Sequence, residues 1–396
     1  MNTTVNYLPH AIFATPDEPV PRVLVAPQRY IQGPDVLDQI GKYLSLVNAH
    51  RAGILVSKRG EHADGVRVIT SLKNAAIEPV ISTFHGECSH DEIDLHVAGL
   101  QGESLDCLLA VGGGKCVDAG KSIAYRLNVP VVIVPTLASN DAPCSAVSVL
   151  YSPEGVFAGA EFFPQNPAMV VVDTGVVANA SERYLVAGMG DAMATWYEAR
   201  VCLQNPNARS TIGARPTLAS YALGEICANT LFEEGQSAAA AVAANRVDES
   251  LEKVVEANTL LSGLGFESGG LAVAYGVAQS YTAVPVVHAN YLHGEMVGMG
   301  TLTQLMMESE DETRRVAEFF ASVGLPVHLG QISLDAGDNG ALDRVVETTM
   351  ASPIIHNMTM PMTPEYIRSS IIGAHELGLS VAESVGDDAY RRLHGD

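Results

Sequence analysis

Residues 111–118 read Val-Gly-Gly-Gly-Lys-Cys-Val-Asp and end an apolar run that begins at Leu105. A short apolar run stopped by glycines is typical of a buried parallel strand, and we expect a helix directly after it. Glycines have no Cβ, so the backbone can approach a diphosphate while the first N–H groups of the helix face its oxygens. A glycine triplet alone also occurs in turns without a ligand, so the neighbouring sequence has to decide.

A second strand and a polar segment follow. After the expected helix over residues 118–126, the β-branched run Val131 to Val134 predicts another parallel strand, closed by Pro135. Ligands of open α/β sheets bind outside the carboxyl ends of the strands. We therefore expect a ligand site at the polar residues that come next, which are Thr136, Ser139, Asn140 and Asp141.

The pattern along the chain predicts two domains. Short β-branched runs at 54–56, 80–83, 105–111, 129–134 and 169–172 alternate with helical stretches, and 147–157 reads as a hairpin with a proline-containing turn. Helical spacing dominates later, at 181–204, 217–234, 237–264, 297–308 and 312–323. We predict a nucleotide-binding α/β domain with a parallel, Rossmann-like sheet over 1–178, including an N-terminal extension over 1–21, and an all-helical domain over 179–396. A cleft between them should hold the ligands.

Composition narrows the classes of function. The 396 residues are 47% hydrophobic and carry a formal net charge of −22, which disfavours nucleic acids and anionic membranes as partners. No stretch reaches the roughly eighteen consecutive apolar residues of a membrane span, and residues 1–20 lack the pattern of a signal peptide. The six cysteines include no CxxC pair, which favours reduced thiols. We expect a cytoplasmic enzyme.

Four ordered motifs carry a family resemblance. They are GGGKxxDxxK at 112–121, PTxASxDAPCSA at 135–146, GxGDAxA at 188–194 and HGE at 293–295. Together they resemble the glycerol dehydrogenase family, the polyol branch of the iron-containing alcohol dehydrogenases. The resemblance implies a dehydroquinate synthase-like fold, a nicotinamide cofactor, a small polar substrate and a homo-oligomer.

The resemblance also implies a metal site, in which Asp191 and His293 match two ligands. Alignment from the segment 268–272 places Tyr275 where the family has a histidine ligand, and a neutral tyrosine is a poor ligand for zinc. Three interpretations stay open. His288 could replace the missing ligand, Tyr275 and water could complete a weakened site, or the metal is absent. We favour the last, with Tyr275 as a proton donor. Asp141, Asp191 and His293 complete the expected catalytic set.

The residues implied for the cofactor follow from the same match. Ser57 stands where the family has an aspartate, and it is followed by Lys58 and Arg59; loss of the carboxylate favours NADP(H) over NAD(H). Asp141 matches a ligand of the substrate hydroxyl. The residues expected along the phosphates are Gly113, Gly114, Lys115 and Asp118; those near the adenosine are Thr136 and Ser139; those near the nicotinamide are Ser145, Val147 and Tyr151.

These observations favour an NAD(P)-dependent oxidoreductase that acts, without a metal, on a small polar alcohol or on the corresponding carbonyl or imine. One alternative is a zinc-dependent polyol dehydrogenase with a relocated ligand. Another is a catalytically silent protein that only binds the cofactor.

Overall fold

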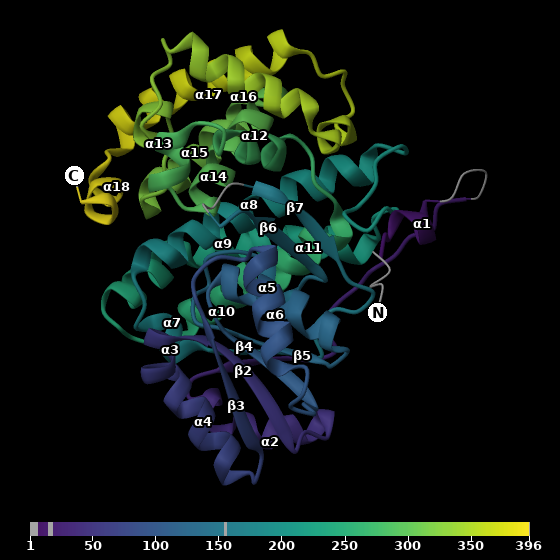
Figure 1. Cartoon of the computed structure of the whole chain (residues 1–396). Coiled ribbons are helices and arrows are strands. Elements are labelled where there is room, and N and C mark those ends of the chain that lie inside the picture. Colours follow the sequence, from purple (N-terminus) through teal and green to yellow (C-terminus); the bar gives the residue numbers. More distant parts are fainter. Residues whose placement is uncertain (1–6, 15–18, 154–156, 396) are drawn as a thin grey trace.

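The computed structural model describes residues 7–14, 19–153 and 157–395. Every strand in these residues lies before residue 174, and the chain after it is helical (Figure 1). The sheet-containing part lies below the helical part in Figure 1, and the segment from β6 to β7 lies near their junction. The predicted combination of a parallel-sheet part and a helical part is confirmed.

The main sheet has the strand order β1-β8-β5-β4-β2-β3, and every neighbouring pair is parallel. Its strands are β1 (Tyr30–Gly33), β2 (Arg51–Ser57), β3 (Glu78–Phe84), β4 (Cys107–Gly112), β5 (Val131–Pro135) and β8 (Met169–Asp173).

Helices cover both faces of this sheet. Successive side chains of a strand point to opposite faces, and in β4 Leu109 packs toward α2 (Ile40–Tyr43) and α4 (Asp64–Asn74). Leu108 packs on the other face toward α5 (His90–Leu100) and α6 (Gly114–Leu127). The continuous apolar run of β4 is therefore explained by burial on both sides.

The rest of this part consists of a hairpin and short helices. Strands β6 (Val147–Tyr151) and β7 (Phe157–Phe162) pair antiparallel, which confirms the predicted hairpin; residues 154–156 of its turn lie outside the described residues. The short helices are α1 (His10–Phe13), α3 (Lys58–His62), η1 (Val36–Gln39), η2 (Leu44–Val47) and η3 (Ala142–Cys144).

The helical part is built around α8 and α14. Its apolar core extends onto the sheet at Ile133 and Val170, so the two parts share one buried cluster. Its helices are α7 (Thr174–Ala178), α8 (Glu182–Gln204), α9 (Leu218–Ala243), α10 (Glu249–Glu256), η4 (Ala257–Leu261), α11 (Ser262–Gly269), α12 (Val273–Tyr281), α13 (Pro285–Asn290), α14 (His293–Glu308), α15 (Glu310–Val323), η5 (Leu329–Ile332), α16 (Asn339–Ala351), η6 (Pro353–Asn357), α17 (Pro364–Val385) and α18 (Asp388–His394). The predicted domain boundary after residue 178 falls between α7 and α8 and stays a prediction.

Several predicted boundaries are wrong. Strand β1 was not foreseen, because Tyr30–Gly33 is only half-buried and carries no apolar alternation. Helix α6 begins at Gly114, four residues before the predicted start. His288 lies in helix α13, and Pro285 is the first residue of this helix, where the missing N–H of a proline costs nothing.

The predicted helix break near Gly235 is also wrong. Helix α9 continues through that position, where a Cβ would lie 2.8 Å from the ring of Phe319, so the glycine serves packing. The chain breaks instead at residues 244–248, where a helix was expected. Asn245 has a φ of +48°, and the Asp248 side chain accepts the Leu251 N–H to cap α10.

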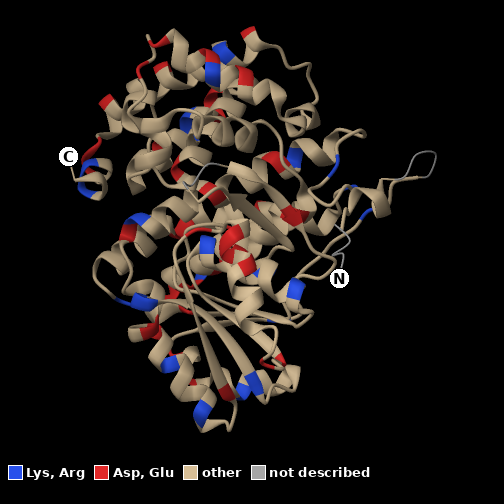
Figure 2. Ribbon diagram, viewed as in Figure 1, with Lys and Arg blue, Asp and Glu red and all other residues tan. Residues whose placement is uncertain are grey.

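Three whole-chain features complete the description. All six cysteines are buried and none forms a disulfide. Among the described residues no single helix is both long and apolar enough to cross a membrane, and only the bent pair Glu249–Gly269 with Val273–Tyr281, at 107°, meets that criterion jointly. In Figure 2 the lysines and arginines of the described residues are dispersed over both parts of the chain.

The contact between α6 and β4 generates the first prediction. A Cβ at Gly120 would lie 2.3 Å from the Cβ of Ala110, so Gly120→Ala should overpack the core and cost about 1–3 kcal/mol. Gly99 lies on the exposed side of α5, where an added methyl group would have nothing within 4 Å, so Gly99→Ala should raise stability by about 0.5–1 kcal/mol. Thermal unfolding of both variants and of the wild type measures these effects. If the two midpoints shift in the same direction from that of the wild type, the described packing of Gly120 is wrong.

Candidate active site

Three segments meet behind the carboxyl end of β5. Asp141 precedes η3, Asp191 lies in the middle of α8, and His293 is the first residue of α14. Tyr275 reaches the same point from α12. The structure thus brings together the four residues that the sequence predicted to be catalytic.

Glycines allow the segments to approach this closely. A Cβ at Gly188 would lie 2.0 Å from the carbonyl oxygen of Ala138, and a Cβ at Gly294 would lie 1.8 Å from that of Ala187. The Asn258 amide donates to the Ala138 and Leu185 carbonyl oxygens, 3.0 Å each, and ties the β5 loop to α8. The glycines of both family motifs therefore fix the spacing of Asp141, Asp191 and His293.

The hydroxyl of Tyr275 lies between two carboxyl groups. Its oxygen is 2.6 Å from Asp141 Oδ2 and 2.6 Å from Asp191 Oδ1. Phe266 stacks on the ring at a centroid distance of 5.9 Å, and His293 meets it edge-on at 5.5 Å. The phenol is thus held by two hydrogen bonds and by aromatic rings on two sides.

These two short contacts fix the number of protons that Tyr275, Asp141 and Asp191 share. A phenol has one hydrogen and can donate to one carboxylate, so the second short contact requires that carboxyl to be protonated and to donate to the phenol oxygen. The Asp141 N–H donates to Asp191 Oδ2 at 3.0 Å, which favours Asp191 as the anion. Burial, and then the charge of Asp191, raise the pKa of Asp141; burial also raises that of Asp191. Asp141 and Asp191 together therefore carry about one negative charge.

His293 stands at the open side of the cluster. Its Nε2 is 3.4 Å from Asp191 Oδ1, and 45% of its side chain is exposed, so water reaches the ring. The protein that surrounds the imidazole still removes part of its hydration, and this lowers the pKa of His293 against the opposing charges of Asp141 and Asp118. The imidazole of His293 is therefore neutral at neutral pH.

A cavity of about 530 Å³ opens in front of this cluster. It is lined by Asp141 and His293 and by most of the predicted cofactor residues, which are Ser57, Gly113, Gly114, Lys115, Asp118, Ser139 and Tyr151. Its described lining does not include the predicted residues Lys58, Arg59, Thr136, Ser145, Val147, Asp191, Tyr275 and His288. Tyr275 and Asp191 therefore lie behind Asp141 and His293. Sequence reasoning missed Phe84, Gly86 and Tyr184, which also line the cavity.

The glycine turn fits an anionic ligand. Helix α6 begins at Gly114, and residues 112–115 line the cavity, so the positive end of a helix of fourteen residues faces it. A Cβ at Gly114 would lie 2.6 Å from the Asn140 amide nitrogen, so a larger residue would displace the wall of this cradle. Lys115 is paired with Glu87 at 2.6 Å and lies 5.8 Å from the ring centroid of Tyr151.

Lys121 joins several segments of the site through its ammonium group. The sequence did not predict this role, although Lys121 is the last residue of the motif at 112–121. Its buried ammonium donates to Asp118 Oδ1 at 3.1 Å and to the Ala142 and Val147 carbonyl oxygens at 2.6 and 2.7 Å. Ser145 Oγ is a fourth neighbour at 3.2 Å and shares one of the three ammonium hydrogens with another acceptor. Ser145 and Val147 thus help to hold Lys121 instead of lining the cavity. The i,i+3 spacing of Asp118 and Lys121 on one helix was the sequence signal that could have indicated this ion pair.

Glu198 supports the cluster from behind. Its Oε1 accepts the backbone N–H groups of Ala272 at 2.6 Å and Tyr275 at 3.0 Å, which anchors the start of α12. Burial raises the pKa of Glu198 to about 8. Glu198 lies four residues after the motif at 188–194, and only the fold shows that it positions Tyr275.

The end of β2 supports only part of the predicted cofactor contact. Ser57 caps α3 by accepting the Gly60 N–H at 3.0 Å and still lines the cavity. Lys58 and Arg59 are exposed on α3. The predicted basic pair is therefore near the cavity along the chain but outside its described lining.

Comparison with known proteins gives the family. The sequence model of the iron-containing alcohol dehydrogenases matches residues 27–174. A glycerol dehydrogenase of Escherichia coli O6:H1 is 43% identical over 362 residues, which cover 90% of this chain and 97% of that protein. The chain belongs to the glycerol dehydrogenase family. It is accordingly an oxidoreductase of the iron-containing alcohol dehydrogenase fold.

Two further members of this family frame the comparison. The crystal structure of glycerol dehydrogenase from Schizosaccharomyces pombe superposes with a TM-score of 0.88 at 32% identity, over 92% of this chain and 93% of that chain. A glycolaldehyde reductase of Halobacterium salinarum is 37% identical, over 91% of this chain and 99% of that protein.

The donor set departs from the metal site that membership in the family implies. Aspartate and histidine are ordinary zinc ligands, and the side chain that lies beside Asp191 and His293 in this cluster is Tyr275. Burial, followed by the charges of Asp141 and Asp191, raises the pKa of Tyr275 well above its ordinary range, so the phenol stays protonated. A protonated phenol engaged with two carboxyl groups does not fit as a third zinc ligand, and His288 does not reach the cavity lining.

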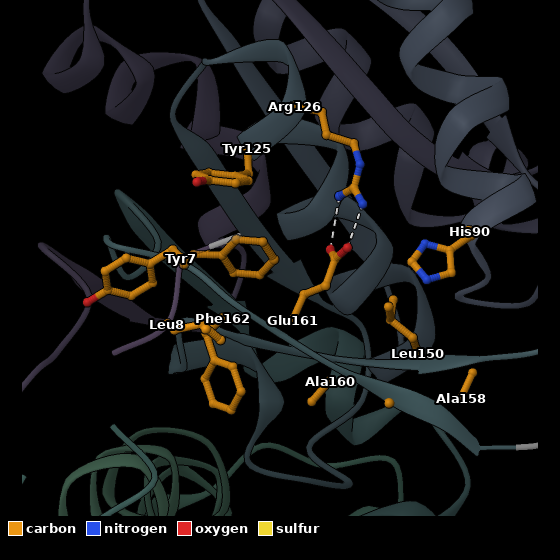
Figure 3. A pocket seen from close by; sticks show the side chains of 12 residues that line it. Tyr7, Leu8, His90, Tyr125, Arg126, Leu150, Ala158, Ala160, Glu161 and Phe162 are labelled. Carbon is orange, nitrogen blue, oxygen red and sulfur yellow. Dashed lines mark hydrogen bonds and ion pairs between the residues drawn. The ribbon is translucent and has the colours of Figure 1, made fainter. Parts of the chain in front are cut away.

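A second hollow, of about 320 Å³, lies between the C-terminal end of α6 and strand β7 (Figure 3). Arg126 and Glu161 pair across it at 2.5 Å, and Tyr7 and Leu8 of the predicted N-terminal extension form one wall. None of the predicted catalytic or cofactor residues lines it. The described part of the extension thus contacts the region of β7 and α6.

The two lysines of α6 generate the second prediction. Lys121→Met leaves the buried Asp118 carboxylate without its cation and should cost about 3–5 kcal/mol of unfolding free energy. Lys115→Met removes a pair whose lysine is 55% exposed and should cost about 0–1 kcal/mol. Urea unfolding of both variants measures the difference. Equal losses would show that Lys121 is not the hub of this region.

Proposed function

We propose that the protein is a nicotinamide-dependent reductase of small polar carbonyl compounds that needs no catalytic metal and takes its proton from Tyr275. The observation that carries this proposal is the phenol hydroxyl held at 2.6 Å from both Asp141 and Asp191. In the reverse direction the same site would oxidise the corresponding alcohol.

The chain supplies binding and orientation for the cofactor. When bound, a reduced nicotinamide supplies hydride to the carbonyl carbon. Gly113, Gly114 and the N-terminal end of α6 offer the diphosphate its contacts, and Asp118, fixed by Lys121, lies at the cavity surface where a ribose would pass. Tyr151 lines the same cavity on the side of the hairpin.

The proton path follows from the positions of the acids. Asp141 lines the cavity, so its protonated carboxyl can donate to the substrate oxygen as hydride adds to the carbon. A proton from solvent enters at Asp191, beside the partly exposed His293. Tyr275, outside the cavity lining, relays it: the phenol accepts the proton of Asp191 as it gives its own to Asp141, and so stays neutral. Asp191 accepts the Asp141 N–H and stabilises the rearranged network. Tyr275 is thus the internal donor and Asp141 the group that touches the substrate.

The substrate class rests on the relatives and on the acids at the cavity. The relatives are named as glycerol dehydrogenases and, at 37% identity, as a glycolaldehyde reductase. Asp141 and His293 at the cavity surface can hydrogen-bond a hydroxyl next to the reacting carbon. We infer a short hydroxy-aldehyde or hydroxy-ketone; an assay panel should add polyols and the corresponding imines.

Tyr275→Phe tests the proton donor. The variant keeps the ring and removes the hydroxyl, so turnover should fall about 10²- to 10⁴-fold with a smaller change in KM. Tyr281→Phe, on the same helix and also buried, is the matched control and should leave turnover unchanged. Steady-state rates of reduced-cofactor oxidation measure both. Wild-type activity that a chelator abolishes, together with an active Tyr275→Phe, would contradict the proposal and favour a metal enzyme.

Tyr275→His tests the reason for the missing metal. A histidine at this position completes the ligand set with Asp191 and His293, so the variant should gain about one chelator-sensitive zinc per chain at this site. Elemental analysis of wild type and variant, each loaded with zinc and desalted, gives the difference. If the wild type already holds zinc that is lost in His293→Ala, the site binds metal with Tyr275 present and the metal-free proposal fails.

We further propose NADP(H) as the preferred cofactor, because Ser57 presents a hydroxyl where a carboxylate would repel a 2′-phosphate. Ser57→Asp keeps a good helix cap and adds charge, so kcat/KM for NADPH should fall about 10-fold or more relative to NADH. Ser57→Asn keeps the cap without the charge and should change this ratio little. A wild-type preference for NADH would refute the assignment.

A further inference from the structure

A cluster of two histidines and a glutamate lies at the edge of the sheet, away from the site described above. His85 follows edge strand β3, and Glu92 and His96 stand one turn apart on α5. The three side chains are graded in burial, with His96 buried, Glu92 half-buried and His85 exposed. Spacing of four residues places Glu92 and His96 on the same face of α5.

The ligand atoms of the cluster converge on one point. Glu92 Oε1 lies 3.0 Å from His85 Nδ1 and 2.9 Å from His96 Nε2. All three ligand atoms lie within 4.8 Å of one another, and the two imidazole rings stack with centroids 6.0 Å apart. Two imidazoles and one carboxylate are the protein ligand set of many zinc sites that leave a fourth position to water.

A neighbouring side chain orients the buried histidine. Ser82 Oγ on β3 lies 2.6 Å from His96 Nδ1. Without a cation, Nε2–H donates to Glu92 and the Ser82 hydroxyl donates to Nδ1. A cation at Nε2 requires the other tautomer, in which Nδ1–H donates to the Ser82 oxygen, and Ser82 is placed to accept it. The backbone N–H of His85 donates to Glu92 Oε1 at 2.7 Å and holds the carboxylate between the two rings.

We propose that His85, Glu92 and His96 bind a divalent transition-metal cation, with zinc as the best match to the ligand set. In a tetrahedral zinc site with bonds of about 2.1 Å, ligand atoms are about 3.4 Å apart. The two measured separations are a few tenths of an ångström shorter, so slight outward rotation of the exposed His85 and of Glu92 accommodates the ion. This site is separate from Asp191 and His293 and does not depend on the proposed function.

The site would stabilise one wall of the cofactor cavity. Phe84 and Gly86 line the cavity on either side of His85, and Glu87 accepts the Lys115 ammonium at 2.6 Å. A cation that joins His85 to α5 would anchor this loop to the helix behind it. The role assigned to it is therefore structural, at the edge of the cavity.

The experiment compares metal content among full-length variants. Protein stripped with a chelator is loaded with Zn²⁺, desalted and measured for zinc per chain. The key variant is His85→Ala, because this side chain is 60% exposed and its loss leaves the core intact. His90→Ala removes an exposed histidine five residues along the same segment and is the matched control. His293→Ala removes the other candidate metal position.

We expect His85→Ala to hold about one zinc equivalent less than wild type, while His90→Ala and His293→Ala keep that equivalent. In a parallel titration with Co²⁺, the visible absorption bands of a bound ion should appear in wild type and be lost in His85→Ala. A difference near zero between wild type and His85→Ala overturns the proposal. It leaves Ser82, His96 and Glu92 as a purely hydrogen-bonded chain, and it does not bear on the Tyr275 variants.

Discussion

Backbone contact without intervening side chains is the constraint on which the candidate active site depends. The β5 loop, the middle of α8 and the start of α14 touch at glycines, and any Cβ at Gly188 or Gly294 would overlap a carbonyl oxygen. Because these contacts are set by the backbone, the side chains of Asp141, Asp191 and His293 arrive at fixed positions. Catalytic groups need this precision, since small displacements of reacting groups are costly.

Given that frame, one side chain, Tyr275, decides how the two buried acids are held. A metal ion would neutralise the two buried aspartates, whereas Tyr275 donates to one carboxyl group, accepts from the other and brings no charge. The cluster meets the cost of burying two acids by keeping a proton on one of them. Tyr275 thus lets the two buried acids share a proton without an added positive charge.

The sequence predicted elements whose signal is local. Strands β2, β4, β5 and β8 are buried apolar runs, and the glycine turn before α6 follows one of them. It missed β1, whose residues are half-buried, and it placed a break at Gly235 because a glycine in a helix looks like an end when its packing partner is unseen.

The candidate site shows the same division between local and tertiary signals. The family resemblance predicted Asp141, Asp191, His293 and Tyr275 as site residues, but not that one phenol would join acids 134 and 84 residues away in the chain. Nor did it show that Lys121 would gather four acceptors from three segments, or that Glu92 would stand between two histidines. Such partners are set by tertiary packing, which no local pattern encodes.

The order of strands in the sheet has a consequence for how the protein is made. Strand β1 is the first to leave the ribosome, yet its parallel partner β8 is the last strand of the sheet to be synthesised. Until β8 emerges, residues 30–33 have no neighbour, while β2, β3, β4 and β5 can already pair with one another. Such distant pairing is slow and leaves unpaired strand edges exposed to other chains. The earliest-made edge of the sheet is thus the one that waits longest for its partner during translation.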